Sequence, residues 1–217
     1  DGVVDGVVDG AADGAADGDA DGADGGDADG AVTGNTRRFG ASFDKIKQVV
    51  DVRDGEIMFG LNMVVHKGKT IFVGDTSVHE YPTSEQMAKI AISTARVVRL
   101  FGFDPKVAFV SHSTFGQPLT SRTKHIKNAV DILKEKKVDF EFDGDMQPDV
   151  ALNPEYKDLY PFSKIVGEAN ILIMPGQHSA AISYKMMKTL GDTKVIGPLL
   201  IGLGLPIEIA PLRSSTS

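Results

Sequence analysis

The stretch VAFVSHSTFGQPLTSRTKHIKNAVDILKEKKVDFEFDGDMQPDVALN, residues 107–153, decides the fold that we predict for this chain. An apolar strand over residues 106–111 leads into a hydroxyl-rich loop, a helix over residues 121–136 and a second strand over residues 138–142. This order of strand, loop, helix and strand is the unit from which parallel sheets are built. Ligands of such sheets bind at the carboxyl ends of the strands, which is where the loop SHSTFGQP falls.

Further elements extend this unit in both directions along the chain. A capping box of Thr83 and Gln86 begins a helix that ends before Gly102. Apolar spacing predicts other helices over residues 43–50 and 179–190, and strands over residues 56–65, 70–75 and 169–175. Because helices alternate with continuous apolar strands, we predict an α/β fold with three layers (α/β/α) and a mostly parallel sheet.

Composition bounds the class of protein. The chain has 217 residues, of which 41% are hydrophobic, which is enough for one ordinary domain or two small lobes. It has no Cys, so it forms no disulfide and no thiolate site, as is common in the cytoplasm, where we expect this protein. No run reaches the roughly 18 apolar residues of a membrane span, and no leader pattern stands at the N-terminus.

The first 30 residues differ from the rest of the chain. They use only Asp, Gly, Ala and Val, and they hold ten Asp and no basic residue. We interpret residues 1–30 as a low-complexity segment, a tag, a placeholder or a disordered stretch, because such a composition buries too little apolar surface to fold. The whole chain has a net charge of −7, but without these 30 residues it has 23 basic and 20 acidic residues. This near balance of charge gives no reason to expect a nucleic-acid partner.

The loop after the first strand is a candidate binding site. Ser111, Ser113 and Thr114 precede a helix whose first turn carries Arg122, so an anion would meet hydroxyls, free N–H groups and a cation. The same residues also suit an ordinary strand-to-helix connection, and both interpretations stay open. His178 and Ser179 follow the next apolar strand and are expected at the same rim.

Two further chemistries have weaker support. Asp143, Asp145 and Asp149 crowd a predicted turn, which suits acid–base chemistry, a divalent cation or a solvated acidic turn. No histidine has the spacing of a metal ligand, and no third partner completes a nucleophilic triad. We therefore predict neither a metal site nor catalytic residues.

Several motifs carry a resemblance to a known family. They are VAFVSHSTFGQP, FEFDGDMQPDVALNP, YPFSKI, ANILIMPGQHSAAISYKMMKTLGDTKVIGPLLIGL, FVGDTSVHEYPTSEQMAKIA and TGNTRRF. With these motifs the chain resembles the phosphotransacetylase-type C-terminal domain of bacterial NADP-dependent malic enzymes over about residues 32–212. The resemblance implies a phosphotransacetylase-like fold, which is isocitrate/isopropylmalate dehydrogenase-like. Residues 55–200 would form the second lobe, and residues 31–54 with 201–217 a remnant of the first.

The resemblance also implies a function. In these malic enzymes a separate region, absent from this sequence, converts malate to pyruvate and CO2 with NADP and a divalent metal. The C-terminal domain is held to be a regulatory and oligomerisation module that senses acetyl-CoA. The chain would then be a separated C-terminal fragment without a cofactor of its own. Its expected partners are acetyl-CoA or a related acyl-CoA, and further copies of itself in a homodimer or higher oligomer; neither nucleic acid nor a membrane is expected.

Departures from the family's pattern bear on catalysis. Phosphotransacetylases carry a Leu-Ser-Arg-Gly motif whose Ser and Arg act on the acyl phosphate, and these two fall here on Pro211 and Leu212. A further family arginine falls near Asp44, whereas Arg37 matches a basic position. An acyl phosphate needs converging cations, so we predict that the chain is not catalytic. The alternatives are an active phosphate acetyl/butyryltransferase and a purely structural assembly module.

The predicted ligand contacts follow from the loop and from the resemblance together. They are Ser111, Ser113, Thr114, Arg122, His178, Ser179, Lys185 and Arg37.

Overall fold

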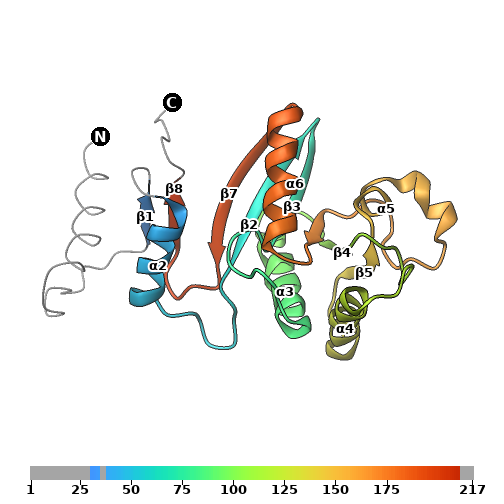
Figure 1. The fold of residues 1–217 in the computed structure, drawn as a ribbon, viewed down its shortest axis with the longest axis horizontal. Coiled ribbons are helices and arrows are strands. Elements are labelled where there is room, and N and C mark those ends of the chain that lie inside the picture. The colour runs from blue at the N-terminus through green and yellow to red at the C-terminus, as the bar shows by residue number, and fades with distance from the viewer. Residues whose placement is uncertain (1–29, 35–37, 211–217) are drawn as a thin grey trace, which may run out of the picture. The chain divides into compact units, whose positions relative to one another are not determined.

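The computed structural model describes residues 30–34 and 38–210 (Figure 1). The predictions for residues 1–29, Arg37, Pro211 and Leu212 lie outside this part of the chain. The described residues form two compact units: one holds those up to Gly55 and from Gly202 onward, and the other is Glu56–Ile201. None of the described helices is long and apolar enough to cross a membrane.

The smaller unit pairs two short parallel strands with one helix. Strand β1 (Ala31–Gly34) lies beside β8 (Ile207–Ala210). Helix α2 (Phe39–Val49) contains most of the predicted helix 43–50 and begins four residues earlier. It buries Phe43 and Ile46, and Phe39 stacks on Phe43. The apolar spacing predicted that Phe43, Ile46, Val49 and Val50 face the core; this is confirmed for Phe43 and Ile46 and wrong for Val49, which is 67% exposed.

The larger unit contains a mixed sheet in the order β7-β2-β3-β6-β4-β5. Its strands are β2 (Phe59–His66), β3 (Lys69–Gly74), β4 (Lys106–Val110), β5 (Glu141–Met146), β6 (Ile171–Ile173) and β7 (Thr193–Ile201). Strand β2 runs antiparallel to both of its neighbours, β3 and β7, and the remaining pairs are parallel. All strands except β2 therefore share one direction, which confirms the prediction of a mostly parallel sheet.

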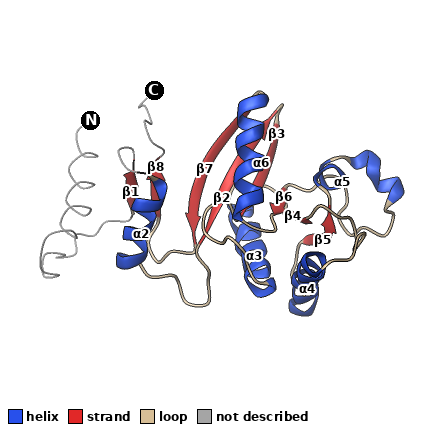
Figure 2. Cartoon of the chain, viewed as in Figure 1, coloured by secondary structure: helices blue, strands red, loops and turns tan. Residues whose placement is uncertain are grey.

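Helices cover both faces of this sheet (Figure 2). Helices α3 (Ser84–Leu100) and α4 (Ser121–Lys136) pack on one face, where Val107 and Phe109 of β4 belong to the larger core. Helices α5 (Pro148–Leu152) and α6 (Gln177–Leu190) cover the other face, where Ala108 and Val110 belong to a second core. Side chains alternate along β4, so one strand supplies both cores. The fold is the predicted three-layer α/β/α arrangement.

Local sequence signals explain where several elements begin and end. The hydroxyl of Thr83 accepts from Gln86 N, and the Gln86 side chain accepts from Thr83 N, which is the predicted capping box. Helix α4 has the predicted bounds and ends at Lys137, which adopts a left-handed conformation with φ 50°. The β2–β3 hairpin turns at Lys67 and Gly68, both with positive φ, as a tight hairpin requires.

One predicted element was placed wrongly. The strand expected over residues 138–142 is β5, which begins at Glu141 and continues to Met146. Asp143 and Asp145 therefore lie within a strand and are buried, whereas the sequence suggested a solvated acidic turn. Their carboxylates accept hydrogen bonds from distant parts of the chain, and these bonds offset the cost of burial.

Candidate functional site

Loops from neighbouring strands meet at the carboxyl edge of the parallel strands. Residues 75–82 follow β3, residues 111–120 follow β4, and residues 174–176 join β6 to α6. Backbone hydrogen bonds connect these loops to adjacent elements: Ser111 N donates to Met146 O at 2.9 Å, and Gln177 N donates to His79 O at 3.0 Å. Because α/β folds bind ligands at this edge, we take these loops as the candidate site.

The hydroxyl-rich loop turns its hydroxyls inward. Ser113 Oγ donates to Asp145 Oδ2 and lies 3.1 Å from Ser111 Oγ. The hydroxyl of Thr114 accepts from Gln147 N at 3.3 Å. All three hydroxyl residues are buried, Ser113 completely. The structure thus brings Ser111, Ser113 and Thr114 together as predicted, but their first partners are groups of the protein itself.

Asp145 is the acceptor that holds this loop. Besides the Ser113 hydroxyl, its carboxylate accepts from Gly116 N at 3.0 Å, and its carbonyl accepts from Phe115 N at 2.6 Å. The residue is 2% exposed. A buried carboxylate that accepts several hydrogen bonds fixes the groups around it. This geometry favours a structural role for Asp145 over the acid–base chemistry considered from the sequence.

Arg122 and His178 come from different helices and contact one aromatic ring. The guanidinium carbon of Arg122 lies 4.7 Å from the centre of the Tyr81 ring, and the His178 ring stacks on Tyr81 with centroids 6.4 Å apart. His178 Nε2 also lies 2.9 Å from an oxygen of the Glu80 carboxylate. No carboxylate among the described residues pairs with Arg122. The structure therefore joins these two predicted residues through Tyr81, which sequence reasoning missed.

The other predicted contacts lie apart from this cluster. Ser179 uses its hydroxyl to donate to Gly176 O at 2.8 Å, which supports the first turn of α6. Lys185 lies further along α6, exposed, with its Nζ 5.9 Å from the ring centre of Tyr184. In the described part of the chain no contact joins Lys185 to the cluster around Tyr81.

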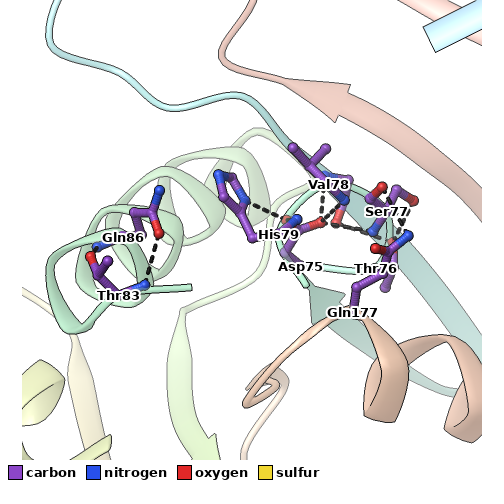
Figure 3. Close-up of polar contacts among 9 residues, drawn as sticks. Asp75, Thr76, Ser77, Val78, His79, Thr83, Gln86 and Gln177 are labelled. Atoms are coloured by element: carbon purple, nitrogen blue, oxygen red, sulfur yellow. Dashed lines mark hydrogen bonds and ion pairs between the residues drawn. The ribbon is translucent and has the colours of Figure 1, made fainter. Parts of the chain in front are cut away.

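The loop over residues 75–79 closes around one carboxylate (Figure 3). Asp75 Oδ1 accepts from the backbone N–H groups of Gly60, Ser77 and Val78 at 2.8–3.1 Å. Oδ2 accepts from His79 N at 2.7 Å and lies 2.6 Å from His79 Nδ1. Asp75 is 1% exposed, so the carboxylate organises the loop from within. An Asp followed by small hydroxyl residues directly after a strand is the sequence signal that could have identified this loop.

His125 attaches the end of this loop to α4. Its Nε2 lies 2.8 Å from Pro82 O, and its Nδ1 lies 3.2 Å from the hydroxyl of Ser84. Nearby, hydrogen bonds from its own backbone N–H and from the Thr83 side chain lower the pKa of Glu85. Among the described residues no three His, Asp or Glu side chains gather as a metal site would require.

Comparisons with known proteins place the chain among two kinds of relative. It is 43% identical to an NADP-dependent malic enzyme of Rhizobium meliloti over 186 residues, which is 86% of this chain and 24% of that protein. The identity with the NADP-dependent malic enzyme of Escherichia coli is 33% over 84% of this chain and 25% of that protein. A phosphate acetyltransferase of Bacillus subtilis is 31% identical over 74% of this chain and 50% of its own length. The chain thus spans about a quarter of the malic enzymes that it matches.

Solved structures show the same fold. A phosphotransacetylase from Streptococcus pyogenes matches 87% of this chain and 58% of its own, with a TM-score of 0.81 and 29% identity. The EutD phosphotransacetylase from Staphylococcus aureus matches 88% of this chain and 59% of its own, with a TM-score of 0.78 and 28% identity. The family described as "Phosphate acetyl/butaryl transferase" matches residues 22–216. The chain belongs to this phosphate acetyl/butaryl transferase family.

Proposed function

We propose that this chain serves as the regulatory and assembly domain of an NADP-dependent malic enzyme, responds to acetyl-CoA or a related acyl-CoA, and does not itself catalyse acyl transfer. The observation that carries the proposal is the 43% identity with the R. meliloti malic enzyme along 86% of this chain. The proposal assigns the NADP and the divalent metal, with malate decarboxylation, to parts of a longer enzyme outside this sequence.

Two features of the chain support a role without catalysis. Pro211 and Leu212 stand where phosphotransacetylases have the Ser and Arg that act on the acyl phosphate. At the rim, the hydroxyls of Ser113 and Thr114 already bond to the protein, through Asp145 and the backbone of residue 147. Without that Ser and Arg the chain lacks the pair that would act on a transferring acyl group, which favours binding of a ligand over acyl transfer.

An exposed cation at the rim, Arg122, supports binding of an anionic ligand. Arg122, His178 and Lys185 are all exposed. Arg122 has no carboxylate partner among the described residues, and its planar guanidinium suits the phosphate groups of CoA. We assign it as the main ligand contact.

The outer face of α6 supports assembly. Ala180 is the only buried residue of this helix. Ile182, Met186 and Leu190 follow one another at intervals of four residues and are 58%, 54% and 84% exposed, so they form a continuous apolar stripe. A second copy of the chain would present the same stripe, and a two-fold symmetric contact would cover both.

Titration calorimetry with acetyl-CoA tests the ligand part of the proposal. We expect binding to the wild-type protein and at least a tenfold loss of affinity for Arg122→Ala, because that change removes a charge-assisted contact to phosphate. Lys134→Ala, on an exposed part of α4, is the matched control and should bind like wild type. Absence of heat at millimolar acetyl-CoA from correctly folded protein would contradict an acetyl-CoA response and leave a purely structural module.

Sedimentation velocity tests the assembly part. Met186→Asp should shift the protein from dimer or larger oligomer toward monomer, because a charge would be buried in the shared apolar stripe. Leu100→Asp places the same charge on another exposed apolar residue, at the end of α3, and should not change the oligomer. An oligomer that survives Met186→Asp unchanged would show that α6 is not the contact.

An active phosphate acetyl/butyryltransferase is the second candidate function. The B. subtilis phosphate acetyltransferase, 31% identical over 163 residues, favours it. The discriminating assay supplies acetyl phosphate and CoA and follows formation of acetyl-CoA. Turnover above the uncatalysed rate that is lost in Arg122→Ala would replace the first proposal with this one.

A further inference from the structure

The loop over residues 75–82 stands between the helix that follows the predicted ligand loop and the helix that carries the apolar stripe. Its tip residue Tyr81, 62% exposed, contacts Arg122 of α4 through its ring and stacks on His178 of α6. One exposed side chain therefore contacts both helices.

The first turn of α6 depends on this loop. Gln177 donates from its backbone to His79 O at 3.0 Å and from its side chain to Ser77 O at 3.0 Å (Figure 3). His178 Nε2 lies 2.9 Å from the Glu80 carboxylate. Because Ala180 is the only buried residue of α6, these polar contacts are a large part of what fixes the start of the helix.

Hydrogen bonds to the Asp75 carboxylate hold the base of the loop, residues 75–79, whereas its tip residue Tyr81 has no such bond to this carboxylate. Asp75 fixes residues 77–79 and binds Gly60 N of β2, so the base is anchored to the sheet. Tyr81 lies beyond this anchor, and the contacts that the structure gives its ring are those with Arg122 and His178. Pro82 O, one residue later, is held by His125. Movement between two anchors is therefore confined to the tip.

Arg122 has two alternative uses. Its guanidinium lies over the Tyr81 ring, and an anionic ligand whose phosphate lies away from the plane of this stacked guanidinium would have to draw it off the ring. We propose that Arg122 and Tyr81 form a switch: a ligand that draws Arg122 away from the ring frees Tyr81, changes its stacking on His178, and so alters the first turn of the assembly helix α6. This inference rests on the proposed function, because it describes how the acyl-CoA response would reach the assembly surface.

The proposal predicts that two substitutions of Tyr81 differ in their effects. Tyr81→Phe keeps the aromatic ring and both ring contacts, so it should behave like wild type. Tyr81→Ala removes the contact that competes with the ligand for Arg122, so acetyl-CoA should bind about two- to fivefold more tightly. The same variant should lose the effect of acetyl-CoA on the dimer dissociation constant. For wild type and Tyr81→Phe we expect an effect of about fivefold or more, as is usual for coupled sites.

A nuclear magnetic resonance measurement tests the switch without any ligand. The imidazole signal of His178 can be assigned among the five histidines with His178→Gln. Arg122→Ala should move this signal in the wild-type and Tyr81→Phe proteins and leave it unchanged in Tyr81→Ala. If Arg122→Ala does not move the His178 signal in the wild-type protein, the switch is wrong, whether or not acetyl-CoA binds.

The two proposals can therefore fail separately. If His178 responds to Arg122→Ala through Tyr81, but acetyl-CoA neither binds nor changes assembly, the switch stands and the proposed function fails. If acetyl-CoA binds and changes the dimer dissociation constant equally in Tyr81→Ala and Tyr81→Phe, the proposed function stands and the switch is wrong.

Discussion

Substitution of Asp75 by Asn tests the structural centre of the candidate site. The change keeps the size of the side chain and replaces one carboxylate oxygen with an NH2 group. In the native loop Oδ1 accepts from three backbone N–H groups, and Oδ2 accepts from His79 N and approaches His79 Nδ1. Whichever way the amide turns, its NH2 group faces backbone donors and leaves at least one of them without an acceptor.

The expected loss follows from these contacts. Hydrogen bonds to a charged group contribute about 1.5–3 kcal/mol each, and a buried donor without a partner costs about 1–3 kcal/mol. In the better amide orientation one such bond, from His79 N, is lost, and the three bonds to Oδ1 become neutral and weaker. We expect Asp75→Asn to lower the free energy of unfolding by about 3 kcal/mol. The corresponding fall in Tm is roughly 6–12 °C for a unit of this size.

Urea unfolding followed by circular dichroism measures this loss. Asp131→Asn is the control, because Asp131 forms an exposed ion pair with Lys134 on α4, and its loss should cost less than about 0.5 kcal/mol. If Asp75→Asn unfolds within about 1 kcal/mol of the wild-type protein, the carboxylate does not organise the loop, and the rigid base assigned to it is wrong.

Three further predictions concern single residues. Burial raises the pKa of Tyr184 above its ordinary value of 10.0. The contribution of the neutral phenol to stability is therefore complete below pH 10 and is lost as the pH rises above 10. Absorbance titration should show that Tyr184→Phe removes an ionisation step above pH 10, not below. Lys137→Gly should stabilise the protein by about 1 kcal/mol in urea unfolding, because φ is 50° there, and an unchanged or lower stability would contradict this. Gly144→Ala should destabilise the protein by about 3 kcal/mol or more, because the φ of residue 144 is 152° and the new Cβ would lie 2.7 Å from Phe109 Cβ. Gly40→Ala is the control: it lies in open space on α2, so the change should be neutral or stabilising.

Elements with local signals could be predicted closely from the sequence. Helix α4 has the predicted bounds because its apolar spacing and its neighbouring turn residues act within a few positions of one another. The capping box at Thr83 is equally local. The turn residues Lys67 and Gly68 of the β2–β3 hairpin also lie between the two strands predicted over residues 56–65 and 70–75, since a glycine there allows a positive φ.

The parts that could not be predicted depend on partners far along the chain. From the sequence alone Asp145 is expected in a surface turn. In the fold β5 pairs with β4, and this pairing brings the Asp145 carboxylate to Ser113. The Tyr81 cluster likewise requires α4 and α6 to meet the β3 loop, from positions about 40 and 100 residues away. Sequence reasoning selected Arg122 because it stands in the first turn of the helix after the hydroxyl-rich loop, and His178 because it follows a strand. It gave no reason to select the exposed aromatic residue that contacts both.

Because only one residue of α6 is buried, the stability of this helix should depend on the concentration of the protein. In an isolated molecule Ala180 is the only buried residue of this helix and Tyr184 packs partly against the core, so the turns beyond Tyr184 should open readily to proteases in dilute solution. In the proposed assembly a second copy covers the stripe, so cleavage near Leu190 should slow as the concentration of the protein rises, and that concentration would then influence its lifetime.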